Sequence, residues 1–206
     1  EQNFHITLYC SDHGYPVIQH DPHVDRFIIQ GRDEVPPAFL AEFWNETKRK
    51  YDKWVNLSES VEASLLALPD RIGATWPQPM RHKYMDHNYL EFMHDIAGTQ
   101  YQWFKAGQRF VPTPEEKEWA VAERAKINGI AILWALAGSS VHKTWPWIDV
   151  TFARLLTATD CTIITTGDKM AQTLAAFPPG LEKAVTEGRI IKQAGQWSIR
   201  QSLAFA

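Results

Sequence analysis

The stretch IAILWALAGSSVHKTWPW, residues 130–147, decides the fold of this chain. Its apolar first part, residues 130–136, predicts a buried strand. A Gly-Ser-Ser turn at residues 138–140 and then Lys143 follow, and Pro146 suits the first turn of a helix. A strand end that leads into a helix start presents unpaired backbone N–H groups and the positive end of a helix dipole, while hydroxyls and an ammonium group add donors and charge. The stretch therefore predicts a site for an anion such as a phosphate.

An ordinary turn explains the same residues without any ligand. Gly-Ser-Ser is a common turn composition, a lysine in a turn is usually only solvated, and Trp-Pro can serve packing alone. The order of strand, small-residue turn, lysine and helix start favours the anion site over this alternative. The residues assigned to the site are Gly138, Ser139, Ser140 and Lys143.

Strand and helix patterns alternate along the whole chain. Strands are predicted at residues 4–10, 24–30, 53–57, 72–76, 130–136, 161–166 and 189–193. Helices are predicted at residues 14–20, 37–50, 60–68, 84–97, 114–127, 147–158, 169–176, 180–187 and 198–206. This alternation predicts an α/β fold with parallel sheets that helices cover on both faces.

One stretch has the composition of a boundary between domains. Residues 105–114 hold one glycine and two prolines, and Thr-Pro-Glu-Glu at 113–116 then opens a helix with a hydroxyl cap, a first-turn proline and early acids. We expect two Rossmann-like domains, the N-terminal one at residues 1–105 and the C-terminal one at 114–206, joined by a linker at 106–113.

A second part of the site is expected at the end of the next strand. Ligands of open parallel sheets bind beyond the carboxyl ends of the strands. Gly167 and Asp168 follow the strand at 161–166, so they should face the same crevice as Lys143 and bind the ribose or base of a nucleotide. Asp168 has an equally good alternative role as the cap of the helix at 169–176.

The sequence AGSSVHKTWP at residues 137–146, followed by DVTFARLL at 149–156, resembles the donor-side signature of the ADP-heptose:lipopolysaccharide heptosyltransferases, glycosyltransferase family 9, and of their phage and bacterial relatives. Four more segments resemble this family in the same order: PVIQHDPHVDRFIIQG (16–31), KYDKWVNLSESVEASLLAL (50–68), CTIITTGD (161–168) and GRIIKQAGQWSIRQSLAFA (188–206). The collinear order of the segments is a stronger argument than any one of them.

The resemblance implies a GT-B type fold and transfer of a sugar from a nucleotide diphosphate, with ADP-heptose as a candidate donor. It implies a glycan or lipid-linked glycan acceptor, such as lipopolysaccharide, no cofactor and no metal. The family's loop with the proposed base should precede Phe4, and its Asp-Thr/Ser-Gly-x-x-His turn should follow Ala206. We therefore expect an internal part of a longer protein, with both domains truncated, the base outside it and no activity alone.

Composition and charge agree with a globular enzyme. The chain has 206 residues, 45% of them hydrophobic, which is enough for two modest cores. Because the net charge is −3 and no long basic block occurs, nucleic acid is not expected as a partner. The apolar runs are far shorter than the roughly 20 residues of a membrane span, so membrane contact would be peripheral. We expect a cytoplasmic protein whose two cysteines, Cys10 and Cys161, are buried reduced thiols.

Other polar and aromatic residues give weaker signals. Asp12, His13 and Asp25 are ionisable and lie near strand ends, but capping and solvated turns explain them more simply than a catalytic base does. No Asp-x-Asp occurs, and although His87 and His94 can share a helical face, the close histidine pair of a zinc site is absent, so no metal is expected. Further histidines are His20, His23 and His82, and tryptophans expected to pack are Trp44, Trp54, Trp103, Trp119 and Trp134.

Two functions remain open from the sequence. The first is a metal-independent glycosyltransferase, in which the backbone donors, the hydroxyls and Lys143 stabilise the leaving diphosphate. The second is a non-catalytic nucleotide- or phosphosugar-binding relative that keeps only the anion site. Resemblance of fold does not decide between them, because function depends on the site.

Overall fold

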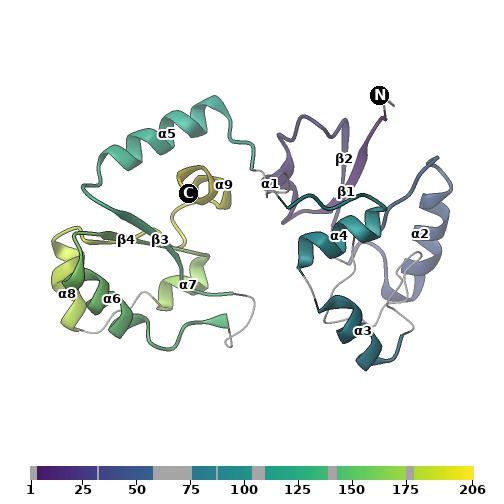
Figure 1. Ribbon diagram of the computed structural model, residues 1–206. Helices are drawn as coiled ribbons and strands as arrows, with labels where there is room; N and C mark the ends of the chain where they lie inside the picture. Colours follow the sequence, from purple (N-terminus) through teal and green to yellow (C-terminus); the bar gives the residue numbers. More distant parts are fainter. Residues whose placement is uncertain are drawn as a thin grey trace. The chain divides into compact units, whose positions relative to one another are not determined.

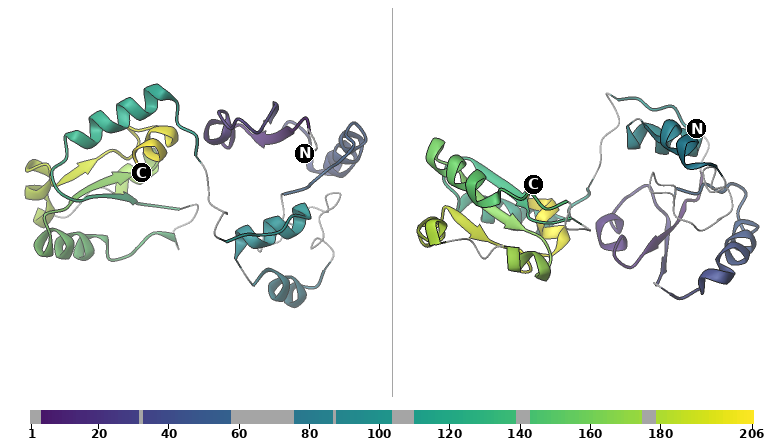
Figure 2. Two further views of the ribbon diagram at one scale, coloured as in Figure 1. Left: turned by 45° about the horizontal axis from the view of Figure 1, so that its top comes forward. Right: turned by 90° about the horizontal axis from the view of Figure 1, so that it is seen from below.

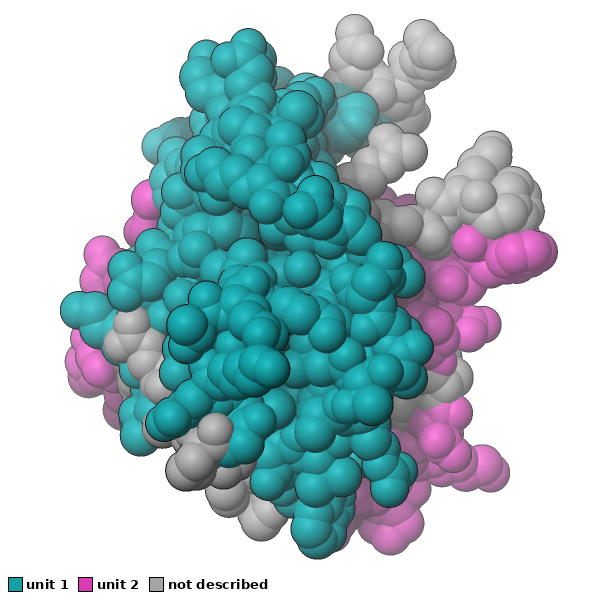
Figure 3. Space-filling model, turned by 90° about the vertical axis from the view of Figure 1, so that its left-hand side faces the viewer, with its two compact units in different colours: residues 1–28, 110–206 teal, residues 29–109 magenta. Residues whose placement is uncertain are grey.

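The computed structural model describes residues 4–31, 33–57, 76–86, 88–103, 110–138, 143–174 and 179–206. Contacts divide the chain into two compact units, one of residues 1–28 with 110–206 and one of residues 29–109 (Figure 3). This division does not follow the expected boundaries, because residues 1–28 group with the C-terminal half of the chain. The domain boundaries at 105 and 114 stay a prediction.

A three-stranded parallel sheet forms the centre of the first unit. It consists of β3 (Ala131–Ala135), β4 (Thr162–Thr166) and β5 (Ile190–Lys192), in the order β3-β4-β5. Ala131 of β3 pairs with Thr162 of β4, and Ile163 of β4 pairs with Ile190 of β5. Because parallel neighbours need crossovers, a helix follows each of these strands along the chain. The expected α/β fold with a parallel sheet is confirmed here.

Helices cover both faces of this sheet (Figures 1 and 2). On one face lie α5 and α9, and on the other lie α6, α7 and α8. Their bounds are α5 Pro114–Ala125, α6 Ile148–Ala158, α7 Lys169–Leu174, α8 Pro179–Thr186 and α9 Ile199–Phe205. The arrangement is the doubly covered parallel sheet that the alternating sequence pattern predicts.

The alternation of side chains along β4 fixes its two packed faces. Ile163 is fully buried against Phe152 of α6 and Leu181 of α8. Ile164 points to the opposite face and is also fully buried, since successive strand residues face opposite ways. The apolar face predicted for α6 is confirmed, because Ile148, Leu155 and Leu156 pack with Phe152 on the same core.

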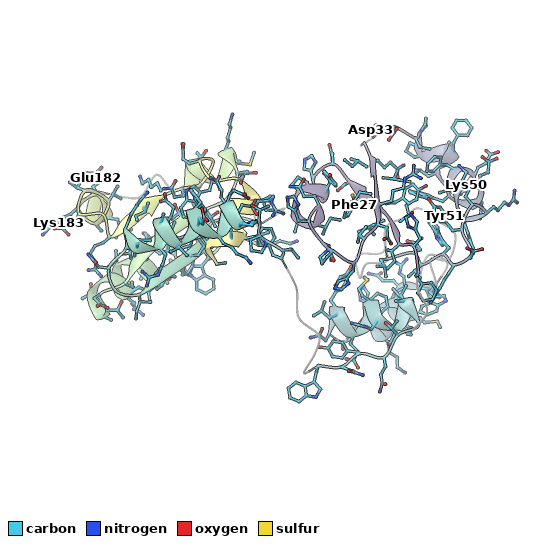
Figure 4. All side chains as sticks on the ribbon, turned by 90° about the horizontal axis from the view of Figure 1, so that it is seen from above. Phe27, Asp33, Lys50, Tyr51, Glu182 and Lys183 are labelled. Atoms are coloured by element: carbon cyan, nitrogen blue, oxygen red, sulfur yellow. The ribbon has the colours of Figure 1, made fainter. Side chains whose placement is uncertain are left out.

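Helix α8 shows the same division between its two sides. Leu181 is buried, and Ala184 and Val185 pack against the core. Glu182 and Lys183 point outward from the helix (Figure 4). This apolar stripe with charged residues opposite is the pattern of a helix that packs on a sheet.

Two helices of this unit begin with complete capping boxes. Thr113 accepts a hydrogen bond from the N–H of Glu116, whose carboxylate accepts one from the N–H of Thr113. Ser198 and Gln201 make the same reciprocal pair at the start of α9. The helix starts predicted at 113–116 and at 198 are therefore confirmed, each with two otherwise unpaired N–H groups satisfied.

The N-terminal segment forms a two-stranded sheet of β1 (Thr7–Ser11) and β2 (Arg26–Gln30), joined through α1 (Tyr15–Ile18). Tyr15 of α1 packs edge-on against Phe27 of β2, which is labelled in Figure 4. Asp25, which directly precedes β2, is bonded to Ile6, which directly precedes β1. The carboxylate of Asp25 accepts a hydrogen bond of 2.6 Å from the N–H of Ile6. Asp25 thus has a structural hydrogen bond to a residue distant in the sequence, which the local pattern around it does not predict.

The second unit is built from helices and aromatic contacts. It contains a 3-10 turn η1 (Pro37–Phe39), α2 (Leu40–Lys48), α3 (Gln78–Met85) and α4 (Tyr89–Ala97). Trp54 packs on Trp44 of α2 and on Tyr51. Lys50 and Tyr51, labelled in Figure 4, lie just beyond α2.

Two predictions for this unit are wrong. Residues 53–57 do not form a strand, and Trp54 within them packs on the rings of Trp44 and Tyr51. The helix expected at 84–97 is split into α3 and α4, since the side chain of Asn88 accepts from the N–H of Leu90 and starts a new helix. The helix expected at 60–68 and nearly all of the strand at 72–76 lie outside the described residues.

The predictions for the tryptophans and cysteines are confirmed only in part. Trp134 packs on Phe152 and Trp119 on Trp197, as expected, whereas Trp103 is 77% exposed and is not part of a buried core. Cys161 is buried and Cys10 half-buried, and both are free thiols; burial raises the pKa of Cys10. Among the described helices, none combines the length and the apolar character needed to cross a membrane.

Candidate functional site

The carboxyl ends of β3, β4 and β5 meet at one edge of the sheet, because the three strands are parallel and paired in register. A glycine lies within three residues of each strand end: Gly138 after β3, Gly167 after β4 and Gly195 after β5. In open parallel sheets, this edge is where ligands bind. We call the three turns together the glycine edge.

The first turn of the glycine edge brings Gly138 and Lys143 into contact. A Cβ atom at residue 138 would lie only 2.7 Å from Cβ of Lys143 and 2.9 Å from its Cδ. The stem of Lys143 therefore passes directly over the backbone of Gly138, and both residues are exposed. Glycine is required here for close approach of the lysine. Ser139 and Ser140 lie outside the described residues, so their place in the site stays a prediction.

The second turn joins β4 to the turn after β5. Gly167 has a φ of 142°, and a Cβ there would lie 2.6 Å from Cβ of Ala171. Its carbonyl accepts a hydrogen bond of 2.7 Å from the N–H of Gly195. Below this turn, the hydroxyls of Thr166 and Ser202 are 2.7 Å apart, which ties α9 to the end of β4. The second and third turns of the glycine edge are thus joined by a hydrogen bond.

Asp168 has the capping role that was weighed as its alternative. One carboxylate oxygen accepts a hydrogen bond of 2.9 Å from the N–H of Ala171 in α7. The side chain is exposed at the glycine edge. A carboxylate has two oxygens and several lone pairs, so this bond is compatible with a second one to a sugar hydroxyl. Nucleotide binding by Gly167 and Asp168 stays a prediction.

Helix α6 starts beside the first turn, and its start differs from the prediction. The helix begins at Ile148 with Trp147 at the cap position, so Pro146 precedes the helix instead of occupying its first turn. Ile148 packs against Leu136, Ala171 and Ala194, which lie at the carboxyl end of the sheet. The first turn of α6 is therefore at the glycine edge, as a strand-to-helix connection on a parallel sheet requires.

The polar candidates near β1 lie in an exposed turn. Nδ1 of His13 is 2.6 Å from Oδ1 of Asp12, and the N–H of His13 donates to the same oxygen. The side-chain hydrogen bond from His13 lowers the pKa of Asp12. Both side chains are exposed, at 91% for His13 and 53% for Asp12. A solvated turn, the simpler interpretation of these residues, agrees with this exposure.

The histidines are not gathered for metal binding in the described parts of the chain. No group of three histidine, cysteine or acidic side chains has the geometry to hold a metal among those residues. Nδ1 of His94 lies 2.8 Å from the hydroxyl of Thr99, and its ring packs against Tyr101. His87 lies outside the described residues.

One polar cluster was missed entirely by the sequence predictions. Arg200 of α9 is buried, with 7% of its surface exposed, and makes an ion pair of two hydrogen bonds with the carboxylate of Glu116. Arg200 also donates to the carbonyls of Pro16, at 2.7 Å, and Val111, at 2.9 Å. Its guanidinium lies 4.5 Å from the ring centre of Phe110. We call this cluster the Arg200 junction.

The Arg200 junction has a strong electrostatic effect on its acid. The hydrogen bonds from Arg200 lower the pKa of Glu116 from 4.5 to about 2. The same carboxylate closes the capping box of α5, so one group serves a helix start and an ion pair at once. The sequence shows only the first of these roles, through Glu116 three residues after Thr113.

Comparison with known proteins supports the fold. The chain is similar to the crystal structure of a glycosyl transferase of family 9 from Veillonella parvula DSM 2008, with a TM-score of 0.61 and 15% identity over 98% of this chain and 63% of that one. It is also similar to the ADP-heptose LPS heptosyltransferase II of E. coli, with a TM-score of 0.49 and 14% identity over 98% of this chain and 66% of that one. No protein-family model matches, and a search of curated proteins gives no significant match.

The first of these similarities shows that the chain has the fold of a family 9 glycosyltransferase, which is of the GT-B type. The family named from the sequence segments is therefore the family whose fold is found. The chain spans 63% of the length of that structure. At 15% identity the similarity concerns the fold, and the activity has to be argued from the site.

Proposed function

We propose that this chain takes part in metal-independent transfer of a sugar from a nucleoside diphosphate to a glycan acceptor. The observation that carries the proposal is the contact between Gly138 and Lys143 at the carboxyl end of β3. It brings an exposed cation and a backbone without a side chain together where parallel sheets bind ligands. The fold shared with a family 9 glycosyltransferase agrees with this class of reaction.

In this reaction the site would have to stabilise the leaving group. When the bond between the sugar and the phosphate breaks, negative charge grows on the diphosphate. Lys143 would meet that charge with its ammonium group, and backbone N–H groups of the turn at 138–140 would add donors. Gly167 and Asp168 would hold the ribose or base from the next turn. No cofactor is needed for this step.

The finer parts of the proposal concern the substrates. The donor proposed is a nucleotide-sugar such as ADP-heptose, which the resemblance of residues 137–156 to the heptosyltransferases suggests. The acceptor proposed is a glycan, including lipid-linked glycans such as lipopolysaccharide, and the place of the reaction is the cytoplasm. Contact with a membrane would be peripheral.

A binding screen tests the proposal. Nucleoside diphosphates and their sugars are titrated by calorimetry against the protein and against Lys143→Ala and Gly138→Ala. Both variants should bind more weakly, because the first removes the cation and the second forces Lys143 away from its present position. Absence of binding by every nucleotide tested, or equal affinity in all three proteins, would overturn the site.

A transfer assay separates the proposed enzyme from its alternative. In the full-length protein, release of nucleoside diphosphate that depends on a glycan acceptor supports transfer, whereas binding without release supports a non-catalytic nucleotide-binding protein. The titrations and the assay are repeated in EDTA, which should change neither result, because Lys143 replaces the divalent cation of metal-dependent transferases. Loss of binding in EDTA that Mg²⁺ or Mn²⁺ restores would contradict the metal-independent mechanism.

A further inference from the structure

Trp145 is an exposed aromatic side chain held in one orientation. Its residue is 53% exposed, and its Nε1–H donates a hydrogen bond of 3.0 Å to the hydroxyl of Thr151 in α6. An exposed indole usually leaves its N–H to water and changes rotamer freely. Here the N–H is used within the chain, so the hydrogen bond favours one orientation of the ring while about half of the residue, 53%, stays exposed.

The place of Trp145 is the glycine edge. It lies two residues after Lys143, whose stem covers Gly138, and its hydrogen-bond partner Thr151 is in the first turns of α6. Ile148 in the same turn packs against Leu136 and Ala171 at the carboxyl end of the sheet. Thr151 and the indole bonded to it are therefore at the same end of the sheet as Lys143.

The chemistry of the ring decides what it can recognise. Because the only hydrogen-bond donor of the indole is occupied, the ring can offer a ligand its face and not a polar contact. Aromatic faces stack on nucleobases, and stacking is tolerant of sequence because every base has a π-face. A fixed ring also loses less conformational freedom when a ligand binds.

We propose that Trp145 is the stacking platform for the base of the nucleotide, beside the diphosphate held by Lys143. The inference rests on the proposed function, which supplies the diphosphate site at Lys143. It adds Trp145 to the residues of that site and predicts which ligands the ring distinguishes. Trp145 recognises that a base is present and does not distinguish adenine, guanine and uracil. Any choice among bases belongs to other residues of the site.

The test compares ligands with and without a base. ADP, GDP, UDP and inorganic pyrophosphate are titrated by calorimetry against the protein and Trp145→Ala. The variant should bind the three nucleotides about 5- to 100-fold more weakly, by similar factors, and should bind pyrophosphate with unchanged affinity. Trp145→Phe should keep nucleotide affinity within roughly threefold, because it keeps an aromatic face.

Two further variants separate the ring from its anchor and from general effects. Thr151→Val removes the acceptor of the indole N–H but keeps the ring, so nucleotide affinity should fall by less than in Trp145→Ala. Trp103→Ala removes an indole that is 77% exposed in the other compact unit and should leave the affinities unchanged. Circular dichroism and thermal unfolding confirm that each variant is folded.

The outcomes distinguish this inference from the proposed function. If the unaltered protein binds neither nucleotides nor pyrophosphate, the proposed function fails. If it binds both and Trp145→Ala binds ADP as tightly as before, or loses pyrophosphate equally, the stacking platform is wrong and the diphosphate site stands. A variant that loses affinity only for the nucleotide-sugar, and not for ADP, places the sugar on the ring and also overturns the inference.

Discussion

Two of the cations in the first compact unit, Lys143 and Arg200, have very different surroundings. Lys143 is exposed at the glycine edge, with its stem over Gly138. Arg200 is buried at the junction of α9, α5 and the N-terminal segment, and it donates to a carboxylate and two carbonyls of the same chain. A buried charge needs internal partners, whereas an exposed one can serve a ligand. We therefore expect Arg200 to stabilise the fold and Lys143 to bind the ligand.

The largest effect on stability is expected from Arg200→Met. Removing the guanidinium leaves the carboxylate of Glu116 without its ion-pair partner and two carbonyls without a donor, so the free energy of unfolding should fall by about 3 kcal/mol. Urea denaturation measures it, and the double variant Arg200→Met, Glu116→Gln should recover part of the loss. A change below about 0.5 kcal/mol, the size of an ordinary surface substitution, would refute the role of the junction.

A smaller effect is expected from Gly167→Ala, which tests the rigidity of the glycine edge. The new Cβ would lie 2.6 Å from Ala171, and the φ of 142° also strains any residue with a Cβ, so we expect a loss of about 2 kcal/mol in the free energy of unfolding. Gly188→Ala is the matched control. Gly188 has a positive φ of 72° but no atom within 4 Å of an added Cβ, so only backbone strain of about 1 kcal/mol should appear. Equal losses in both variants would show that packing at residue 167 is unimportant.

The pH dependence of stability should report on Glu116. Its pKa is about 2 in the folded protein and 4.5 ordinarily. Because the folded pKa is lowered, the contribution of Glu116 is complete above pH 4.5 and is lost as the pH falls from 4.5 through about 2. Glu116→Gln should therefore show a shallower fall of the melting temperature in this range. Parallel curves for the two proteins would mean that the ion pair does not shift this carboxyl group.

The smallest effect on stability is expected from Lys143→Ala. The side chain is exposed, so the free energy of unfolding should change by less than about 0.5 kcal/mol in urea denaturation. This small change contrasts with the loss of about 3 kcal/mol in the free energy of unfolding expected for Arg200→Met. A loss as large as that of the arginine variant would mean that Lys143 stabilises the fold as Arg200 does, and would contradict the contrast between the two.

The parts of the fold that could be predicted are those with local signals. The apolar runs at β3, β4 and β5, and the Thr113 and Ser198 caps, each carry their information within a few neighbouring residues. Gly138 and Lys143 are in contact, and they are only five positions apart in the sequence, but their role as a site stays a prediction.

Other features depend on partners that are distant in the sequence. Arg200 meets Glu116 84 residues away and Pro16 184 residues away, and no local pattern announces such a contact. Residues 53–57 have a strand-like composition, but Trp54 packs on Trp44 of α2 and on Tyr51. The break between α3 and α4 did have a local signal in Asn88, which the periodic apolar pattern around it concealed.

The assignment of the glycine edge as a binding site requires that Lys143 binds a diphosphate. Calorimetric titration of ADP into the unaltered protein and into Lys143→Ala, both checked to be folded, measures this in one comparison. The loss of a charge-assisted hydrogen bond, about 1.5–3 kcal/mol, predicts that the variant binds ADP about 10- to 150-fold more weakly. Equal affinity in the two folded proteins would contradict the diphosphate site at the glycine edge.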